Sequence, residues 1–131
     1  MSWVSVFAGF LVAHMVGDYL FQTDWQARNK RGGLSSSGTA RRALFMHVTT
    51  YTLAFVPAFI WIGDELGAGW AVLAAALVAL PHLVVDDGRI ISLYLTRVKH
   101  AEATDARIAG PVDQSFHALS LCIVALLIGA V

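Results

Sequence analysis

The sequence has few charged residues and almost no cysteine, and each shortage excludes a class of protein. Of its 131 residues, 14% are charged, 57% are hydrophobic and one, Cys122, is a cysteine. A single cysteine excludes a disulfide framework and a cysteine-rich zinc site. Nine Lys and Arg balance nine Asp and Glu, so there is no basic excess and nucleic-acid binding is not expected. Because soluble domains carry about 25% charged residues, the composition predicts an integral membrane protein.

Four apolar stretches account for most of the chain. A membrane-spanning helix needs roughly 20 apolar residues, so this length allows about four spans. We predict an all-α, polytopic four-transmembrane-helix bundle that forms one domain over residues 1–131. The predicted spans are at about 3–22, 43–63, 68–88 and 112–131, separated by loops at about 23–42 and 89–110. The second of these loops begins amphipathic and is predicted to hold a short interfacial helix, and Gly110-Pro111 is predicted to open the last span.

The positive charges predict an orientation. All nine Lys and Arg lie in the two loops 23–42 and 89–110. The positive-inside rule therefore predicts cytoplasmic loops, with the N- and C-termini and the Asp64-Glu65 turn outside. We predict a multi-pass protein of the bacterial inner (cytoplasmic) membrane. The tryptophans suit an interfacial aromatic belt, three near the outer helix ends and one near the inner end: Trp3, Trp61, Trp70 and Trp25.

Ionisable residues recur within the predicted spans. Three His/Asp pairs are each spaced four residues apart and so share one helix face: His14 with Asp18, His82 with Asp86, and Asp113 with His117. The remaining span supplies His47, with Tyr51 one turn along. A helical rise of 1.5 Å per residue places the four histidines at ~16–21 Å from the outer surface and the carboxylates at ~22–27 Å. We therefore predict a polar well in the inner half of the bilayer that opens towards the cytoplasm, since such costly groups face one another inside bundles.

Histidine nitrogens and carboxylate oxygens together predict a divalent metal site. They are the ligands of zinc, and also of manganese and iron, and helix bundles build such sites from facing helices. Zinc is the first expectation, and seven donors exceed the four that one zinc ion takes, so we expect one or two ions. The predicted ligands are His14, Asp18, His47, His82, Asp86, Asp113 and His117. Three further residues are expected to orient these ligands or to contact a substrate: Gln22, Tyr51 and Gln114.

Such a site predicts metal-assisted hydrolysis of a lipid or a lipid-linked ester, amide or phosphoester at the cytoplasmic leaflet. Asp18 or Asp86 would be the general base, and basic loop residues would hold an anionic head group. A metal-ion or proton transporter or channel component is the main alternative, although the ionisable groups stop in the inner half of the bilayer. A structural membrane subunit of a larger complex is another, in which the His/Asp pairs join helices. Self-association is also open, since Gly9, Gly17 and alanine-rich faces favour helix contacts.

Three features are predicted to lie outside the site. Asp87 is off the His82–Asp86 face and is expected to pair with Arg89. His100 is expected in a solvated loop. Residues 31–38, RGGLSSSG, lack the Gly-Lys-Ser/Thr ending of a phosphate-binding loop, so we expect a linker or a lid there.

The motifs carry a family resemblance. Residues 14–30, HMVGDYLFQTDWQARNK, resemble the opening motif of the domain of unknown function 3307 family, which are small bacterial and phage membrane proteins. His47, HLVVD at 82–86 and DQSFH at 113–117 are similar to its remaining motifs and occur in the same order. The resemblance covers essentially the whole chain. It implies a helical membrane protein and supports the site residues without naming a reaction. The pattern is also loosely similar to inner-membrane metal-dependent hydrolases.

Overall fold

Every regular element in the computed structural model, which describes residues 1–35 and 38–131, is a helix. In chain order they are α1 (Trp3–Met15), the π-helical turn η1 (Val16–Phe21), α2 (Asp24–Asn29), α3 (Gly38–Ala54), α4 (Val56–Leu66), α5 (Ala68–Asp86), α6 (Arg89–Arg97) and α7 (Ala106–Gly129). Residues 36 and 37, which belong to the predicted loop 23–42 and its RGGLSSSG linker or lid, lie outside the described residues.

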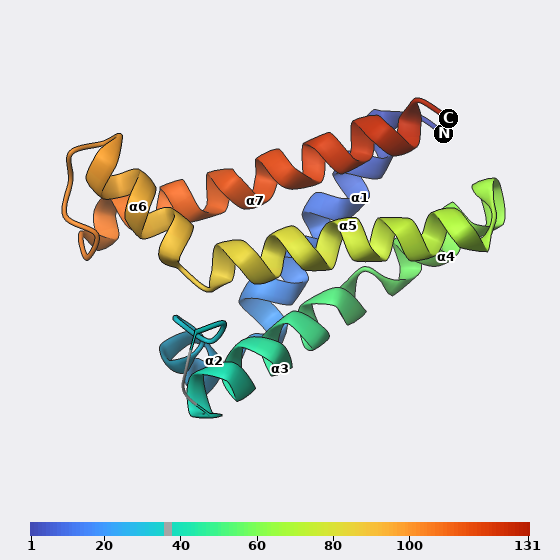
Figure 1. Ribbon diagram of the computed structural model, residues 1–131. Coiled ribbons are helices and arrows are strands. Elements are labelled where there is room, and N and C mark those ends of the chain that lie inside the picture. Colours follow the sequence, from blue (N-terminus) through green and yellow to red (C-terminus); the bar gives the residue numbers. More distant parts are fainter. Residues whose placement is uncertain (36–37) are drawn as a thin grey trace.

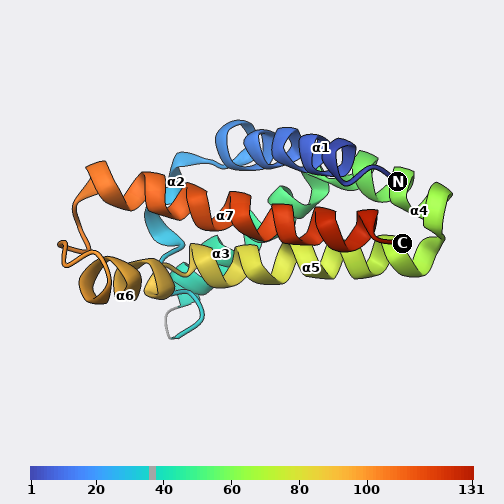
Figure 2. The same ribbon diagram turned by 90° about the horizontal axis from the view of Figure 1, so that it is seen from above.

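The long helical segments lie alongside one another. α7 packs on α1 and α5, and α5 also packs on α3 and α4. The turn between α4 and α5 lies at the same end of the molecule as both chain termini, whereas α2 and α6 lie at the opposite end (Figures 1 and 2). The predicted loops that carry the Lys and Arg residues therefore share one end of the fold.

Among the described residues, three helical segments are long and apolar enough to cross a membrane: Trp3–Phe21, Ala68–Asp86 and Ala106–Gly129. A fourth is obtained if α3 and α4, which meet at a bend of 53°, count as one span. The outer surface is correspondingly apolar, with Leu20, Val72 and Val12 each more than 60% exposed. Such large apolar side chains on the surface suit contact with lipid tails.

The predicted span 43–63 is not one continuous helix. α3 ends at Ala54 and α4 begins at Val56. Pro57 has no N–H to donate to the carbonyl of Leu53, and its ring crowds that carbonyl, so a helix bends at this point. Phe55 N donates instead to Thr52 O at 3.1 Å. The proline was visible in the sequence, but the prediction did not use it.

The last helix begins earlier than predicted. α7 begins at Ala106, so Pro111 lies inside the helix and the prediction that Gly110-Pro111 opens it was wrong. The physical reason is the cap at Asp105, whose carboxylate accepts a hydrogen bond from Arg107 N. Hydrogen bonds from the Arg107 side chain and backbone also lower the pKa of the Asp105 carboxyl. The interfacial helix predicted at the start of this loop is α6.

Two single residues, Asp87 and His100, were predicted to lie outside the site. Asp87 pairs with Arg89 as expected, and it also accepts a hydrogen bond from Leu34 N at 2.8 Å. His100 is exposed.

The core has an apolar half and a polar half. Towards the chain termini it is filled by apolar side chains, with Phe10, Phe55 and Phe59 in edge-on and stacked contact at ring-centroid distances of 5.6–6.5 Å. Towards the α2 and α6 end the core contains buried histidines and the buried Asp86 and Asp87, and a smaller apolar cluster that includes Ile91 and Leu95 joins α5, α6 and α7 there. The second half holds the candidate site.

Candidate metal centre

The structure brings all seven predicted ligands into one cluster. Each long helical segment supplies part of it. α1 and η1 supply His14 and Asp18, α3 supplies His47, and α5 and α7 each supply a His/Asp pair. Three overlapping groups have ligand atoms that all lie within 4.8 Å of one another: His14, Asp18 and His82; His47, His82 and Asp86; Asp86, Asp113 and His117. All four histidines are at most 2% exposed. The i,i+4 spacing and the helical rise therefore predicted a real convergence of side chains.

The π-helical turn places Asp18 at the cluster. The wider turn at Val16–Phe21 follows directly on α1, and such turns are frequent at functional sites. Gly17 lets this backbone approach α3, because a Cβ at this position would lie 2.6 Å from Tyr51 Cδ2 and 3.2 Å from Tyr51 Cα. A side chain at this position would require Tyr51 to shift, so the close approach of η1 to α3 depends on this glycine.

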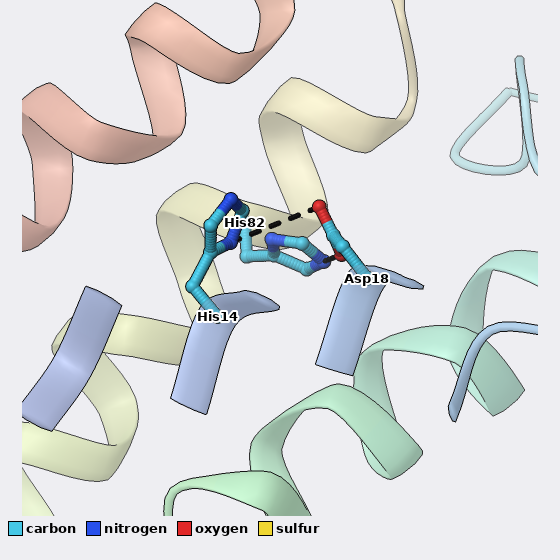
Figure 3. Close-up of side chains that lie close together, drawn as sticks. All are labelled: His14, Asp18 and His82. Atoms are coloured by element: carbon cyan, nitrogen blue, oxygen red, sulfur yellow. Dashed lines mark ion pairs between the residues drawn. The ribbon is translucent and has the colours of Figure 1, made fainter. Parts of the chain in front are cut away.

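The tightest part of the cluster is a set of four atoms. His47 Nε2 lies 3.0 Å from His82 Nε2, 2.8 Å from Asp86 Oδ2 and 3.3 Å from Asp18 Oδ1. His82 Nε2 lies 3.1 Å from Asp86 Oδ2 and 3.6 Å from Asp18 Oδ1. Figure 3 shows His14 and His82 converging on the Asp18 carboxylate from α1 and α5.

These separations fit a tetrahedral divalent ion. Zinc binds nitrogen and oxygen at about 2.0–2.2 Å, which places tetrahedral ligands at ~3.3–3.5 Å from one another. Five of the six separations within the set are 2.8–3.6 Å, so they run from hydrogen-bond length up to that value. In addition, Asp18 Oδ1 is buried and has no hydrogen-bond partner among the described residues. A buried carboxylate oxygen without a donor is costly, and a cation between these four atoms would satisfy it.

His117 and Asp113 extend the cluster behind His82. The Nδ1 atoms of His82 and His117 are 3.1 Å apart, so one of them carries the proton that the other accepts. If His82 Nε2 binds an ion, its proton is on Nδ1 and is donated to His117 Nδ1, which leaves the His117 proton on Nε2. That atom lies 3.3 Å from Asp86 Oδ1 and 3.5 Å from Asp113 Oδ2. This proton placement makes His117 a residue that orients His82.

A hydrogen-bond chain holds Asp18 from the other side. Tyr51 Oη is 3.1 Å from His14 Nδ1, and His14 Nε2 is 3.0 Å from Gln114 Oε1. Because the amide oxygen only accepts, His14 carries its proton on Nε2 and accepts from the tyrosine. Gln114 Nε2 then donates to Asp18 Oδ2 at 3.4 Å. Both nitrogens of His14 are therefore engaged, and Tyr51 and Gln114 contact the predicted ligands His14 and Asp18.

Gln22 also lies where it was expected. Its Nε2 atom is 3.1 Å from Nδ1 and 3.0 Å from Nε2 of His47. The ring of Tyr51 stacks directly on the ring of His82: the two centroids are 3.4 Å apart and the rings are nearly parallel. These contacts hold the imidazole rings of His47 and His82, both of which belong to the four-atom set, in place.

Sequence reasoning missed Lys30. Its Nζ donates to Asp86 Oδ2 at 2.7 Å, and only 13% of the side chain is exposed. Residues 30–34 thereby cover the cluster where α5 ends. This side of the cluster was predicted to be open to the cytoplasm. No local signal distinguished this lysine from the other loop cations, because its partner is 56 residues away.

The more accessible edge of the cluster lies between η1 and α7. The side chain of Asp113 is 24% exposed and that of Asp18 is 7% exposed, against 1% for Asp86. At this edge the side chain of Gln114 from α7 reaches Asp18 of η1, with Nε2 3.4 Å from Oδ2. A small molecule or an ion would therefore reach the cluster from this side.

Comparison with known proteins identifies the family. Residues 6–131 match the family model described as Protein of unknown function (DUF3307), which covers nearly the whole chain. Neither the curated proteins nor the solved structures gave a match. The motifs whose order suggested this family supply all seven residues of the cluster. The chain belongs to the DUF3307 family.

Proposed function

We propose that this protein spans the bacterial inner membrane four times, with the α2 and α6 end in the cytoplasm. The support is the apolar surface of the long helical segments and the gathering of all nine Lys and Arg at that end. Asp64 and Glu65, at the end of α4, would then be outside. In this orientation the His/Asp cluster is at the depth of the inner leaflet.

We propose further that the cluster binds a divalent ion and that the protein hydrolyses a lipid or a lipid-linked substrate. The observation that carries this is the four-atom set of His47, His82, Asp18 and Asp86, in which five of the six separations are 2.8–3.6 Å, close to those between tetrahedral ligands. Lys30 can keep its hydrogen bond, because a carboxylate oxygen has more than one lone pair. A bound ion would supply Lewis acidity to polarise the scissile carbonyl or phosphoryl group.

Asp18 is the better candidate for the general base. Asp86 is surrounded on both oxygens, by Lys30 and two histidines at Oδ2 and by His117 at Oδ1. Asp18 has Oδ2 within reach of only Gln114 and His14, at 3.4 and 3.7 Å, and it lies at the accessible edge. It would accept the proton of a water that attacks the scissile bond, and that proton would pass to the leaving group.

The apolar half of the core favours hydrolysis over transport. A transporter or channel component needs a polar path from the cluster to the other membrane face. Instead, the helices continue from the cluster into a core that includes Phe10, Phe55, Phe59 and Ile62. The polar site thus ends at an apolar core and is open to one leaflet only.

The test is metal content together with lipid hydrolysis. The full chain is purified in detergent from cells grown with zinc, manganese and iron, and its metals are measured by inductively coupled plasma mass spectrometry. We expect about one equivalent of ion in the native protein and at least tenfold less in His82→Ala. The exposed His100 is the matched control. His100→Asn suits its positive φ of 51° and is expected to keep the ion.

The same samples are reconstituted with a bacterial lipid extract, and released fatty acids and phosphorylated head groups are measured. We expect release by the native protein and by His100→Asn, and none by Asp18→Asn. A folded native protein without stoichiometric metal contradicts the metal centre. Metal without release contradicts the hydrolase and leaves the transporter or a structural subunit, which would tolerate His82→Ala.

A further inference from the structure

A second polar cavity lies beside the metal centre, at the end with α2 and α6. Its volume is about 290 Å³, and it is lined by residues 31, 87–89, 92, 103 and 104. Two of the lining residues are arginines, Arg31 and Arg89, and two carry hydroxyl groups, Ser92 and Thr104. Basic loop residues were expected to hold an anionic head group, but nothing in the sequence singled out these two arginines among them.

Hydrogen bonds hold one wall of this cavity in place. Gly32 N donates to Asp87 O at 2.9 Å, and Leu34 N donates to Asp87 Oδ1 at 2.8 Å. These bonds fasten residues 30–34 to the turn between α5 and α6, so that the Arg31 side chain lies over Gly88. A Cβ at Gly88 would be 3.4 Å from Arg31 Cγ, and its φ of +83° already favours glycine. Arg31 is therefore positioned by main-chain contacts.

The charges of this cavity are only partly neutralised. Asp87 is paired with Arg89 Nε, which leaves the two terminal nitrogens of that guanidinium without a protein partner in the described ranges. Arg31 makes no ion pair or hydrogen bond within residues 1–35 and 38–131. Two guanidinium groups against one carboxylate leave the cavity positive. Arginine donors in a fork, next to hydroxyl groups, match the oxygens of a phosphate.

We propose that this cavity binds the phosphate group of a membrane lipid and so holds that lipid at the end of the fold where the metal centre lies. Asp86 of the four-atom set and Asp87 of the cavity wall are consecutive residues whose side chains point in different directions, so the cluster and the cavity lie on different sides of the end of α5. The cavity also lies at the cation end of the fold, where lipid head groups are in the proposed orientation. As a substrate assignment, this inference rests on the proposed function; phosphate binding itself does not.

The test uses two lipids that differ only in phosphate. The full chain is placed in nanodiscs of a galactolipid, which carries no phosphate, together with either phosphatidic acid or diacylglycerol with the same acyl chains, and lipids retained by the released protein are counted by native mass spectrometry. We expect retention of phosphatidic acid and not of diacylglycerol. Arg31→Gln, which keeps the Asp87–Arg89 pair, is expected to weaken retention roughly tenfold. Arg31→Gln/Arg89→Gln is expected to abolish it.

Arg41→Gln/Arg97→Gln is the matched control, since both arginines are exposed and neither lines the cavity. It removes the same charge as the double variant and is expected to leave retention unchanged. An equal loss in this control would show general attraction to the positive end and would overturn the proposal. Displacement by millimolar glycerol 3-phosphate or inorganic phosphate would overturn the assignment to a lipid.

Metal content separates this inference from the proposed function. Arg31→Gln is expected to keep its ion, because Arg31 is not among the ligands. Retention of phosphatidic acid by a metal-free protein would contradict only the metal centre. Full metal content with no effect of Arg31→Gln would contradict only the phosphate site.

Discussion

The two halves of this core are built from the same helices but are held together differently. In the half near the chain termini, aromatic side chains such as Phe10, Phe55 and Phe59 pack without polar partners. In the other half, buried imidazoles and carboxylates contact one another at 2.8–3.7 Å. Close packing tolerates small adjustments of shape, whereas buried polar groups need every partner. The comparison predicts that changes in the polar half will affect both stability and metal binding, and that changes in the apolar half will affect stability alone.

The largest effect is expected from Asp86→Asn. This change leaves the Lys30 ammonium largely buried without its counter-charge, and breaking such a pair costs about 3 kcal/mol. The free energy of unfolding is measured in detergent with a chelator present, so that lost metal does not contribute. Lys30→Met in the same chain is expected to recover much of the loss, and the exposed Asp64→Asn is the control. Stability of the single variant within 0.5 kcal/mol of the native protein would contradict a structural ion pair.

Phe55→Ala is expected to have the next largest effect. Phe55 is fully buried, and its ring lies 4.9 Å from that of Tyr51 and 5.6 Å from that of Phe10. In a membrane the lost term is mainly packing, since lipid tails are as apolar as the core, so we expect about 2 kcal/mol. Metal content, measured on the folded fraction, is expected to be unchanged. The exposed Leu53→Ala is the matched control, and metal loss in Phe55→Ala would show that the two halves are not independent.

The smallest effect in free energy is expected from Gly17→Ala, which lies where the two halves meet. The added Cβ would press on Tyr51, and overpacking of this kind costs about 1 kcal/mol or somewhat more. Because Tyr51 stacks on His82 and donates to His14, metal content is expected to fall as well. Gly9→Ala is the control, since no atom lies within 4 Å of its Cβ position and alanine favours a helix. Equal behaviour of the two variants would contradict a close approach at Gly17.

Local patterns predicted much of the candidate site. The i,i+4 pairs and the helical rise were enough to expect His14, His47, His82 and His117 at one depth, because both follow from helix geometry alone. Lys30 was missed, since its contact with Asp86 depends on how a polar loop folds back over the bundle. The bend at Phe55 was missed although Pro57 indicated it, and the start of α7 was placed too late because the cap at Asp105 was not considered.

The sequence by itself determined that this chain is helical and apolar, that its positive charges gather at one end, and which side chains share a helix face. These properties depend on residues that are close together in the chain. The tertiary structure decided which faces meet, and therefore that Asp18 and Asp86 both lie beside His47 and His82 and that Lys30 pairs with Asp86. It also decided that Arg31 and Arg89 share a cavity. Such contacts join residues tens of positions apart, and only the packing of all the helices sets their distances.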